Sequence, residues 1–211
     1  MPKVKPHRTS PSLDMTPMVD LAFLLVTFFM LTTQFRPEDA VIVDPPSSTS
    51  DLRNPDSDVL TLTIDDKKRV FFGFDKASVK EEALKSMGIK YNVSFTKQQL
   101  AQFRNINSIG VPIKQLGSYL SMSTEERKEL NPRLPGIPYD SLNNQLIDWV
   151  QGARQANLNL FSKQSFVSIK GDGAADVQTV QKIISELQKA KINRFNLVTS
   201  LEGNPTTEAA Q

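Results

Sequence analysis

Hydrophobic residues form one long run near the start of the chain and shorter periodic runs after it. The long run, residues 18–31, holds nine Val, Leu and Phe residues and a single charge, Asp20. No other charge occurs in residues 16–34, and these nineteen residues would cover roughly 28 Å as a helix, close to the apolar thickness of a bilayer. The pattern predicts a transmembrane helix over residues 16–35, with Pro17 in the first turn, where its missing N–H costs nothing.

The charges that flank this run give it a direction. Lys3, Lys5 and Arg8 precede it, whereas Glu38 and other acids follow it. The excess of positive charge predicts that residues 1–15 are a cytoplasmic tail and that the chain after the helix lies on the far side of the membrane. A cleavable signal peptide has the same order of basic and apolar residues, but no small-x-small cleavage site follows the run. A helix buried in a soluble core is the other alternative for so short a run.

Asp20 is the candidate functional residue, because a carboxylate is costly at that place. A charged Asp at the centre of a membrane helix opposes insertion by about 2.5–3.5 kcal/mol, while each Val, Leu or Phe favours it by about 0.3–0.6 kcal/mol. On a helical wheel, Thr16, Thr27 and Gln34 lie within about 40° of Asp20. We predict that this polar stripe faces protein or a channel rather than lipid. The alternative is that Asp20 only snorkels toward the headgroups or bonds a neighbour.

The chain beyond the helix divides into a linker and a folded domain. Prolines and a Ser-Ser-Thr-Ser run predict a flexible linker over residues 36–58, whose roughly 22 residues could reach on the order of 70 Å. Residues 59–203 are predicted to form the domain. The tail, residues 204–211, is predicted to be disordered.

Alternation and helical periodicity predict an α+β domain with a mixed β-sheet packed by helices. We expect a hairpin, a helix starting at Pro112, a short helix capped by Ser123, a helix capped by Asp140 or Ser141, and a final β–α–β unit whose helix has an apolar face starting at Val177. If both strands of that unit join one sheet, they are parallel. The expected strands cover residues 59–64, 69–74, 91–95, 165–170 and 194–199, and the longer helices cover residues 111–122, 141–157 and 176–191.

Composition excludes several classes of function. The chain has no cysteine, one histidine and a net charge of +2, which leaves no thiol chemistry, no His-based triad or zinc site, and no case for nucleic-acid binding. Gly171–Gly173 is interpreted as a turn rather than a phosphate loop. Asp65 and Asp66 could hold a hard cation but are interpreted as a solvated turn. Of the three phenylalanines in the returning hairpin strand, two are expected in the core. We therefore expect no enzyme, no cofactor and no metal site.

Residues 13–30, Leu-Asp-Met-Thr-Pro-Met-Val-Asp-Leu-Ala-Phe-Leu-Leu-Val-Thr-Phe-Phe-Met, resemble the membrane anchor of the ExbD/TolR family of biopolymer transport proteins. The Thr-Pro-x-x-Asp core at residues 16–20 is the hallmark of that family. The hairpin, the helix at 141–157 and the β–α–β end resemble the family more loosely. Ile169-Lys-Gly-Asp172 lies where the family usually has a basic-small-Asp step. Residues 75–139 are interpreted as an insertion relative to shorter members.

This resemblance implies a single-pass protein of the inner (cytoplasmic) membrane with a cytoplasmic N-terminus and a periplasmic C-terminal domain. It implies a homodimer whose anchors lie within a pentamer of ExbB/TolQ-type proton-channel subunits, and a TonB/TolA-type protein as a further partner. Asp20 matches the aspartate that carries protons while the complex uses the proton motive force to energise TonB-dependent outer-membrane transport. The alternative is a TolR-like module for envelope integrity that binds peptidoglycan, with Asp20 serving only helix assembly.

Overall fold

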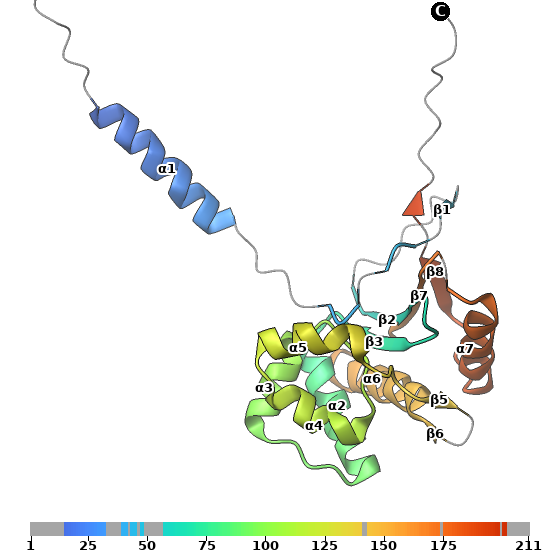
Figure 1. Cartoon of the computed structure of the whole chain (residues 1–211). Coiled ribbons are helices and arrows are strands. Elements are labelled where there is room, and N and C mark those ends of the chain that lie inside the picture. The colour runs from blue at the N-terminus through green and yellow to red at the C-terminus, as the bar shows by residue number, and fades with distance from the viewer. Residues whose placement is uncertain are drawn as a thin grey trace, which may run out of the picture. The chain divides into compact units, whose positions relative to one another are not determined.

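The computed structural model of the chain describes residues 15–32, 39–41, 43–45, 47–48, 57–140, 143–173, 175–198 and 200–201. They belong to two compact units, Met1–Arg36 and Pro37–Gln211. The first unit holds α1 (Thr16–Thr32), and the second holds every other described helix and strand (Figure 1).

The second unit is built around a five-stranded sheet with the strand order β4-β3-β2-β7-β8. β3 runs antiparallel to β2 and β4, whereas β7 runs parallel to β2 and β8, so the sheet is mixed. The predicted α+β class, the hairpin and the parallel β–α–β unit are confirmed. The five strands are β2 (Val59–Ile64), β3 (Val70–Phe74), β4 (Ser108–Ile109), β7 (Phe166–Gly171) and β8 (Phe195–Val198).

One face of this sheet carries the apolar core. Leu60, Leu62 and Ile64 alternate along β2, and the parallel register sets the first two beside Val167 and Ile169 of β7. All five side chains are buried, as expected for the side of a strand that faces a core. Three helices contribute residues to the same core: α2 (Ala77–Tyr91), α6 (Gln145–Phe161) and α7 (Val177–Lys189).

Trp149 of α6 joins the sheet to a layer of helices. Its ring centroid lies 5.3 Å from that of Phe72 on β3 and 5.8 Å from that of Phe103 on α3, within the range of favourable aromatic contacts. The layer is formed by residues that the sequence suggested were an insertion, yet its helix α2 packs directly against α6. Besides α2, the layer contains α3 (Lys97–Asn105), α4 (Ile113–Ser121), α5 (Thr124–Leu130) and the 3-10 turn η1 (Asn131–Arg133).

Capping residues start the helices of this layer. Thr96 with Gln99, and Ser123 with Glu126, form capping boxes at the starts of α3 and α5. Each box satisfies two backbone N–H groups that lack a partner within the helix. The box at Ser123 and the helix that follows Pro112 are both predicted from the sequence and confirmed.

The strand predicted at residues 91–95 is wrong. α2 continues to Tyr91 and ends at Asn92, which adopts a left-handed conformation with φ of 53°. The Val93 N–H then donates to the Gly88 carbonyl at 2.9 Å. The alternating apolar residues of this segment therefore lie in chain that folds back over the end of α2. Asn92 makes that turn possible, because asparagine tolerates a positive φ.

The helix α6 begins later than predicted. Asn144 caps it by accepting a hydrogen bond from the Ile147 N–H at 3.2 Å. Asp140 does not cap it but belongs to a short ladder between β5 (Tyr139–Asp140) and β6 (Asn143–Asn144); Ser141 lies outside the described residues. The helix also runs beyond residue 157, to Phe161.

Two expectations about apolar side chains also need correction. All three phenylalanines of β3 are buried, one more than predicted, because Phe71 also belongs to the core, where it packs against Gly110. Val177 is 66 % exposed, whereas Ile183 and Leu187 of the same helix are buried. The apolar face of α7 therefore starts one turn later than the sequence suggests.

Part of the predicted linker is not free but lies against the second unit. Ala40 and Val43 are buried, and the Ala40 N–H donates to Ser108 Oγ at 2.9 Å. Asp44 accepts from the Gly173 N–H at 2.8 Å. Farther along, β1 (Ser47–Ser48) pairs in parallel with β9 (Ser200–Leu201). The described residues of the segment 39–48 thus contact β4, the turn after β7, and β9.

Candidate functional site

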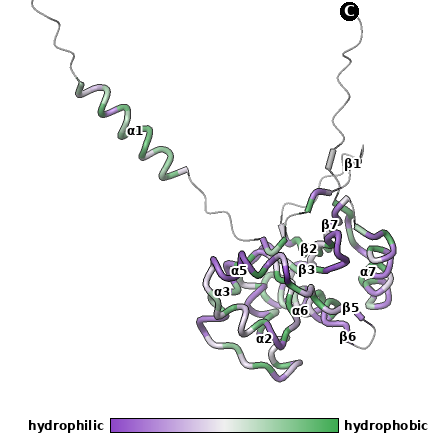
Figure 2. The backbone as a smooth tube through the Cα atoms, in the orientation of Figure 1, coloured by the Kyte–Doolittle hydropathy of each residue, from purple (hydrophilic) through white to green (hydrophobic). Residues whose placement is uncertain are grey.

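α1 is hydrophobic over most of its circumference. None of its residues is buried, and each of its Val, Leu, Phe and Met side chains is at least 50 % exposed. Figure 2 shows the hydrophobic character extending along the helix. A helix that is apolar on every side is stable where lipid or other protein surrounds it.

The described length of α1 is 17 residues, about 26 Å at 1.5 Å per residue. In the part of the chain that the structure describes, no helix has both the length and the apolar character needed to cross a membrane. The helix begins at Thr16, so Pro17 lies in its first turn. The predicted segment ends at residue 35, and its residues 33–35, with Gln34 of the polar stripe, lie outside the described residues.

Asp20 shares one side of α1 with Thr16 and Thr27, because these positions lie within about 40° on a regular helix. The Thr27 hydroxyl donates to the carbonyl oxygens of Phe23 and Leu24, at 3.0 and 2.9 Å. Its proton is therefore satisfied within the helix, which makes threonine cheap to place in apolar surroundings. Among the described residues of α1, Asp20 is therefore the one strongly polar side chain.

The chemistry available to Asp20 is proton transfer. It is the one titratable side chain among residues 15–32. Apolar surroundings favour the protonated form of a carboxyl group, whereas water and hydroxyl groups favour the ionised form. A lone carboxyl group on an apolar helix can therefore take up one proton in one environment and release it in another.

An ionic cluster lies where the chain enters the sheet. Asp58 directly precedes β2, is 4 % exposed and has φ of 65°. Lys76 donates a hydrogen bond to its carboxylate and lies 4.2 Å from the centroid of the Phe161 ring. The Asp58 N–H donates to the Asp75 carboxylate at 2.7 Å. The hydrogen bond from Lys76 lowers the pKa of Asp58, against the opposing effect of burial.

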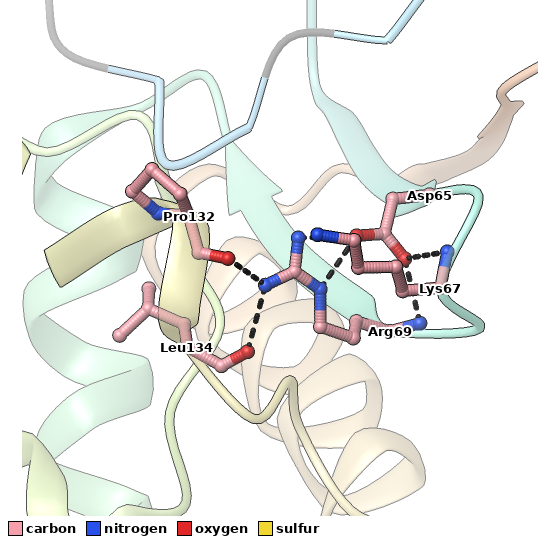
Figure 3. A network of polar contacts seen from close by, with 5 residues as sticks. All are labelled: Asp65, Lys67, Arg69, Pro132 and Leu134. Carbon is pink, nitrogen blue, oxygen red and sulfur yellow. Dashed lines mark hydrogen bonds and ion pairs between the residues drawn. The ribbon is translucent and has the colours of Figure 1, made fainter.

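The hairpin turn carries a second buried ion pair, shown in Figure 3. Arg69 Nε and Nη2 both lie 2.6 Å from Asp65 Oδ2. The backbone N–H groups of Lys67 and Arg69 donate to Asp65 Oδ1 at 3.0 and 2.8 Å. Arg69 Nη1 donates to the carbonyl oxygens of Pro132 and Leu134, at 2.7 and 2.9 Å. The network ties the hairpin to the segment that follows α5.

The interpretation of Asp65 as part of a solvated turn is therefore wrong. Asp65 is 2 % exposed, whereas Asp66 beside it is exposed. Its oxygens are used by Arg69 and by the turn, so its role is structural. Among the described residues, no three His, Cys, Asp or Glu side chains gather as metal ligands would.

Sequence reasoning missed the cluster at the start of β2, although a signal for it exists. The hairpin register sets Leu60 opposite Phe74, and two further residues along each strand bring Asp58 opposite Lys76. An acid and a lysine in mirrored positions beyond a hairpin indicate a cross-strand pair. The contacts of residues 39–48 have no comparable signal, because prolines and serines are typical of a free linker.

The comparisons with known proteins agree with the anchor motif. A protein-family profile described as biopolymer transport protein ExbD/TolR matches residues 6–202. That match covers α1 and nearly all of the second unit. No curated protein matches the chain.

Proposed function

Because the chain belongs to the ExbD/TolR family of biopolymer transport proteins, we propose that it converts proton flow across a membrane into work on the cell envelope, with Asp20 as the proton carrier. The observation that carries the proposal is the placement of Asp20. Among residues 15–32 it is the one titratable group, and it lies on a largely apolar helix that buries none of its residues. Such a group is retained in an apolar helix where function requires it.

The proposal places residues 16–35 in the inner membrane, with α1 supplying 17 of them. Seventeen residues are at the lower limit for a membrane-spanning helix. The basic residues before α1 favour a cytoplasmic N-terminus, which puts the second unit in the periplasm. The nine Val, Leu and Phe residues between Val19 and Leu31 favour insertion by roughly 4 kcal/mol in total, enough to offset one acid.

The stripe of Asp20, Thr16 and Thr27 needs a polar or protein partner within the membrane. We propose that an ExbB/TolQ-type channel pentamer supplies it and encloses the anchors of a homodimer of this chain. Asp20 is protonated when it faces apolar neighbours and ionised when it faces channel hydroxyls and water. One proton that crosses 100 mV releases about 2.3 kcal/mol, which is comparable with the cost of placing the acid in the membrane.

That free energy turns or shifts the anchors within the channel, and the chain after α1 passes the movement to the second unit. A TonB/TolA-type protein then couples the movement to transport at the outer membrane. The support for these partners is the family membership and the apolar surface of α1, which needs surroundings that its own unit does not provide.

The test replaces Asp20 by asparagine, which keeps the size and removes the titration. We expect Asp20→Asn to assemble with the channel partner in detergent but to abolish proton flux through the complex in vesicles and energy-dependent uptake of iron chelates in cells. The matched control is Asp66→Asn, an equal change at an exposed turn of the second unit.

Undiminished flux and uptake in Asp20→Asn would contradict the proposal. That result would favour the TolR-like alternative, an anchored module for envelope integrity in which Asp20 serves only helix assembly. Binding of peptidoglycan by the full-length chain, unaffected by Asp20→Asn, would complete the case for that alternative.

A further inference from the structure

A groove of about 550 Å³ lies between α2 and α6 and has no role in the function proposed above. Lys90 and Met87 of α2 line one side, and Asp148, Gly152, Arg154 and Leu158 of α6 line the other. Its volume falls within the range of ligand sites.

Arg154 is the first feature of this groove that points to a ligand. It is half-buried, and within the described part of the chain it makes no hydrogen bond or ion pair. The acid of the groove, Asp148, bonds other groups instead. Lys90 Nζ lies 2.6 Å from Oδ1, and the Tyr91 hydroxyl donates to Oδ2 at 2.6 Å. The groove therefore has an excess positive charge and a guanidinium group with five free donors, suited to a carboxylate.

Gly152 is the second feature. It lies in the middle of α6, where glycine is a poor helix former. A Cβ atom at this position would meet no other atom within 4 Å, and its backbone does not need a positive φ. Neither packing nor conformation requires glycine here. Its effect is to leave the α6 wall of the groove open at this position.

The remaining lining residues favour a peptide over a flat or ring-shaped ligand. No aromatic side chain is among the lining residues that the structure describes, so a ring has no surface on which to stack. Gln151 and Gln164 instead offer amide groups, which can pair with the N–H and C=O groups of a peptide backbone. Leu158, which is 46 % exposed, offers apolar contact to an aliphatic side chain.

We propose that the groove between α2 and α6 binds a short acidic segment of a partner protein. A carboxylate of the segment pairs with Arg154, its backbone lies along the two glutamines, and a neighbouring aliphatic side chain packs against Leu158. The site is independent of α1 and of proton transfer by Asp20.

The experiment selects a displayed random library of short linear peptides on the purified full-length chain in detergent. We expect enrichment of peptides in which Glu or Asp stands next to an aliphatic residue. Synthetic copies of enriched peptides should bind Arg154→Gln about tenfold more weakly, the loss typical of a charge-assisted hydrogen bond. Arg194→Gln, the same change at an exposed position of the second unit, should bind them as the wild type does.

Gly152→Met gives a readout that a purely structural role would not move. Methionine is a good helix former and has room here, so this variant should melt at the wild-type temperature or above it while binding the peptides at least about tenfold more weakly. No acidic enrichment, or equal binding by Arg154→Gln and Gly152→Met, would overturn the proposal. Tighter binding of an acidic oligosaccharide such as oligogalacturonate would overturn the assignment to a peptide.

Discussion

At the scale of single residues, the partners of an aspartate decide its role. Asp58 and Asp65 are buried in the second unit, and each has a cation within hydrogen-bonding distance. Such a partner offsets the cost of burying the charge, so these two acids have structural roles. Asp20 lies on a helix that offers no cation among its described residues, so a charged partner for it would have to come from outside that helix.

The ion pair of Asp58 and Lys76 predicts a dependence of stability on pH. Because the folded-state pKa of Asp58 is lowered, its contribution to stability is present above the unfolded-state pKa, about 3.9. That contribution is lost as the pH falls through the folded-state pKa. Urea unfolding of residues 37–211 should therefore show that Asp58→Asn is less stable than the wild type above about pH 4 and that the difference shrinks at lower pH.

Asparagine is the appropriate replacement because it also tolerates the φ of 65° at this position. Lys76→Gln should remove the same pH dependence, and Asp66→Asn should leave it unchanged. A stability difference for Asp58→Asn that stays constant from neutral to acidic pH would contradict this assignment.

The ion pair of Asp65 and Arg69 predicts a large loss of stability when the cation is removed. Asp65 is 2 % exposed, and Arg69→Gln removes the charged partner of its carboxylate. Breaking a buried pair in this way costs about 3 kcal/mol or more, which urea unfolding would measure. Lys67→Gln, a change in the same turn, should cost little, because Lys67 contacts Asp65 through its backbone N–H. Equal effects of the two variants would contradict the role given to Arg69.

The two neighbours Asp65 and Asp66 show where sequence reasoning stops at this scale. Asp20 could be singled out because the residues around it in the chain set the character of the whole helix. Asp65 could not be told from Asp66, because the carbonyls that complete the network belong to Pro132 and Leu134, 63 and 65 residues away from Arg69. A contact at that separation leaves no local pattern.

At the scale of elements, the strongly periodic segments and the helix starts at Pro112 and Ser123 were predictable, whereas the end of α2 and the start of α6 were not. The hairpin, α4, α7 and the β–α–β end follow from alternation and from an apolar helical face. The strand expected at residues 91–95 failed because Asn92 ends α2 in a left-handed conformation. The early start expected for α6 failed because several polar residues in that segment could act as a cap, and Asn144 is the one whose side chain accepts the hydrogen bond from the Ile147 N–H.

Two helix glycines predict opposite effects of the same substitution. A Cβ at Gly88 would lie 2.7 Å from the Val93 carbonyl oxygen, whereas a Cβ at Gly152 would meet no atom within 4 Å. We expect Gly88→Ala to destabilise the second unit by about 1–3 kcal/mol through the clash. Gly152→Ala should stabilise it by about 0.5–1 kcal/mol, because alanine is the better helix former. Thermal melting of the two variants beside the wild type measures both. A gain in stability for Gly88→Ala would contradict the close approach of Val93.

At the scale of the whole molecule, the two units have different physical needs. The main apolar core of the second unit lies between Ala40 and Ile192 and draws no residue from α1. The second unit can therefore fold without the first, whereas the apolar surface of α1 needs lipid or protein from outside. The predicted linker is what the sequence described least well, since residues 40 and 43 belong to the buried part of the second unit.

We propose that release of the segment 39–48 from its contacts would lengthen the free chain between the units. Its ten residues would add roughly 31 Å of reach, at about 3.1 Å per residue. Val43 is 5 % exposed, and the burial of its side chain stabilises the attached state of the segment by about 1.5–3 kcal/mol. A charge at this position cannot stay buried, so Val43→Asp should detach the segment and leave the sheet intact.

Hydrogen exchange measures this release. In Val43→Asp, the amides of Ala40 and Gly173, which bond Ser108 and Asp44 in the wild type, should exchange at least about tenfold faster. The amides of β2 should keep their protection, because that strand is held by ladders on both sides. Asp39→Asn, a change at an exposed position of the same segment, should leave both sets unchanged. Unaltered exchange at Ala40 in Val43→Asp would mean that the burial of Val43 does not hold the segment in place.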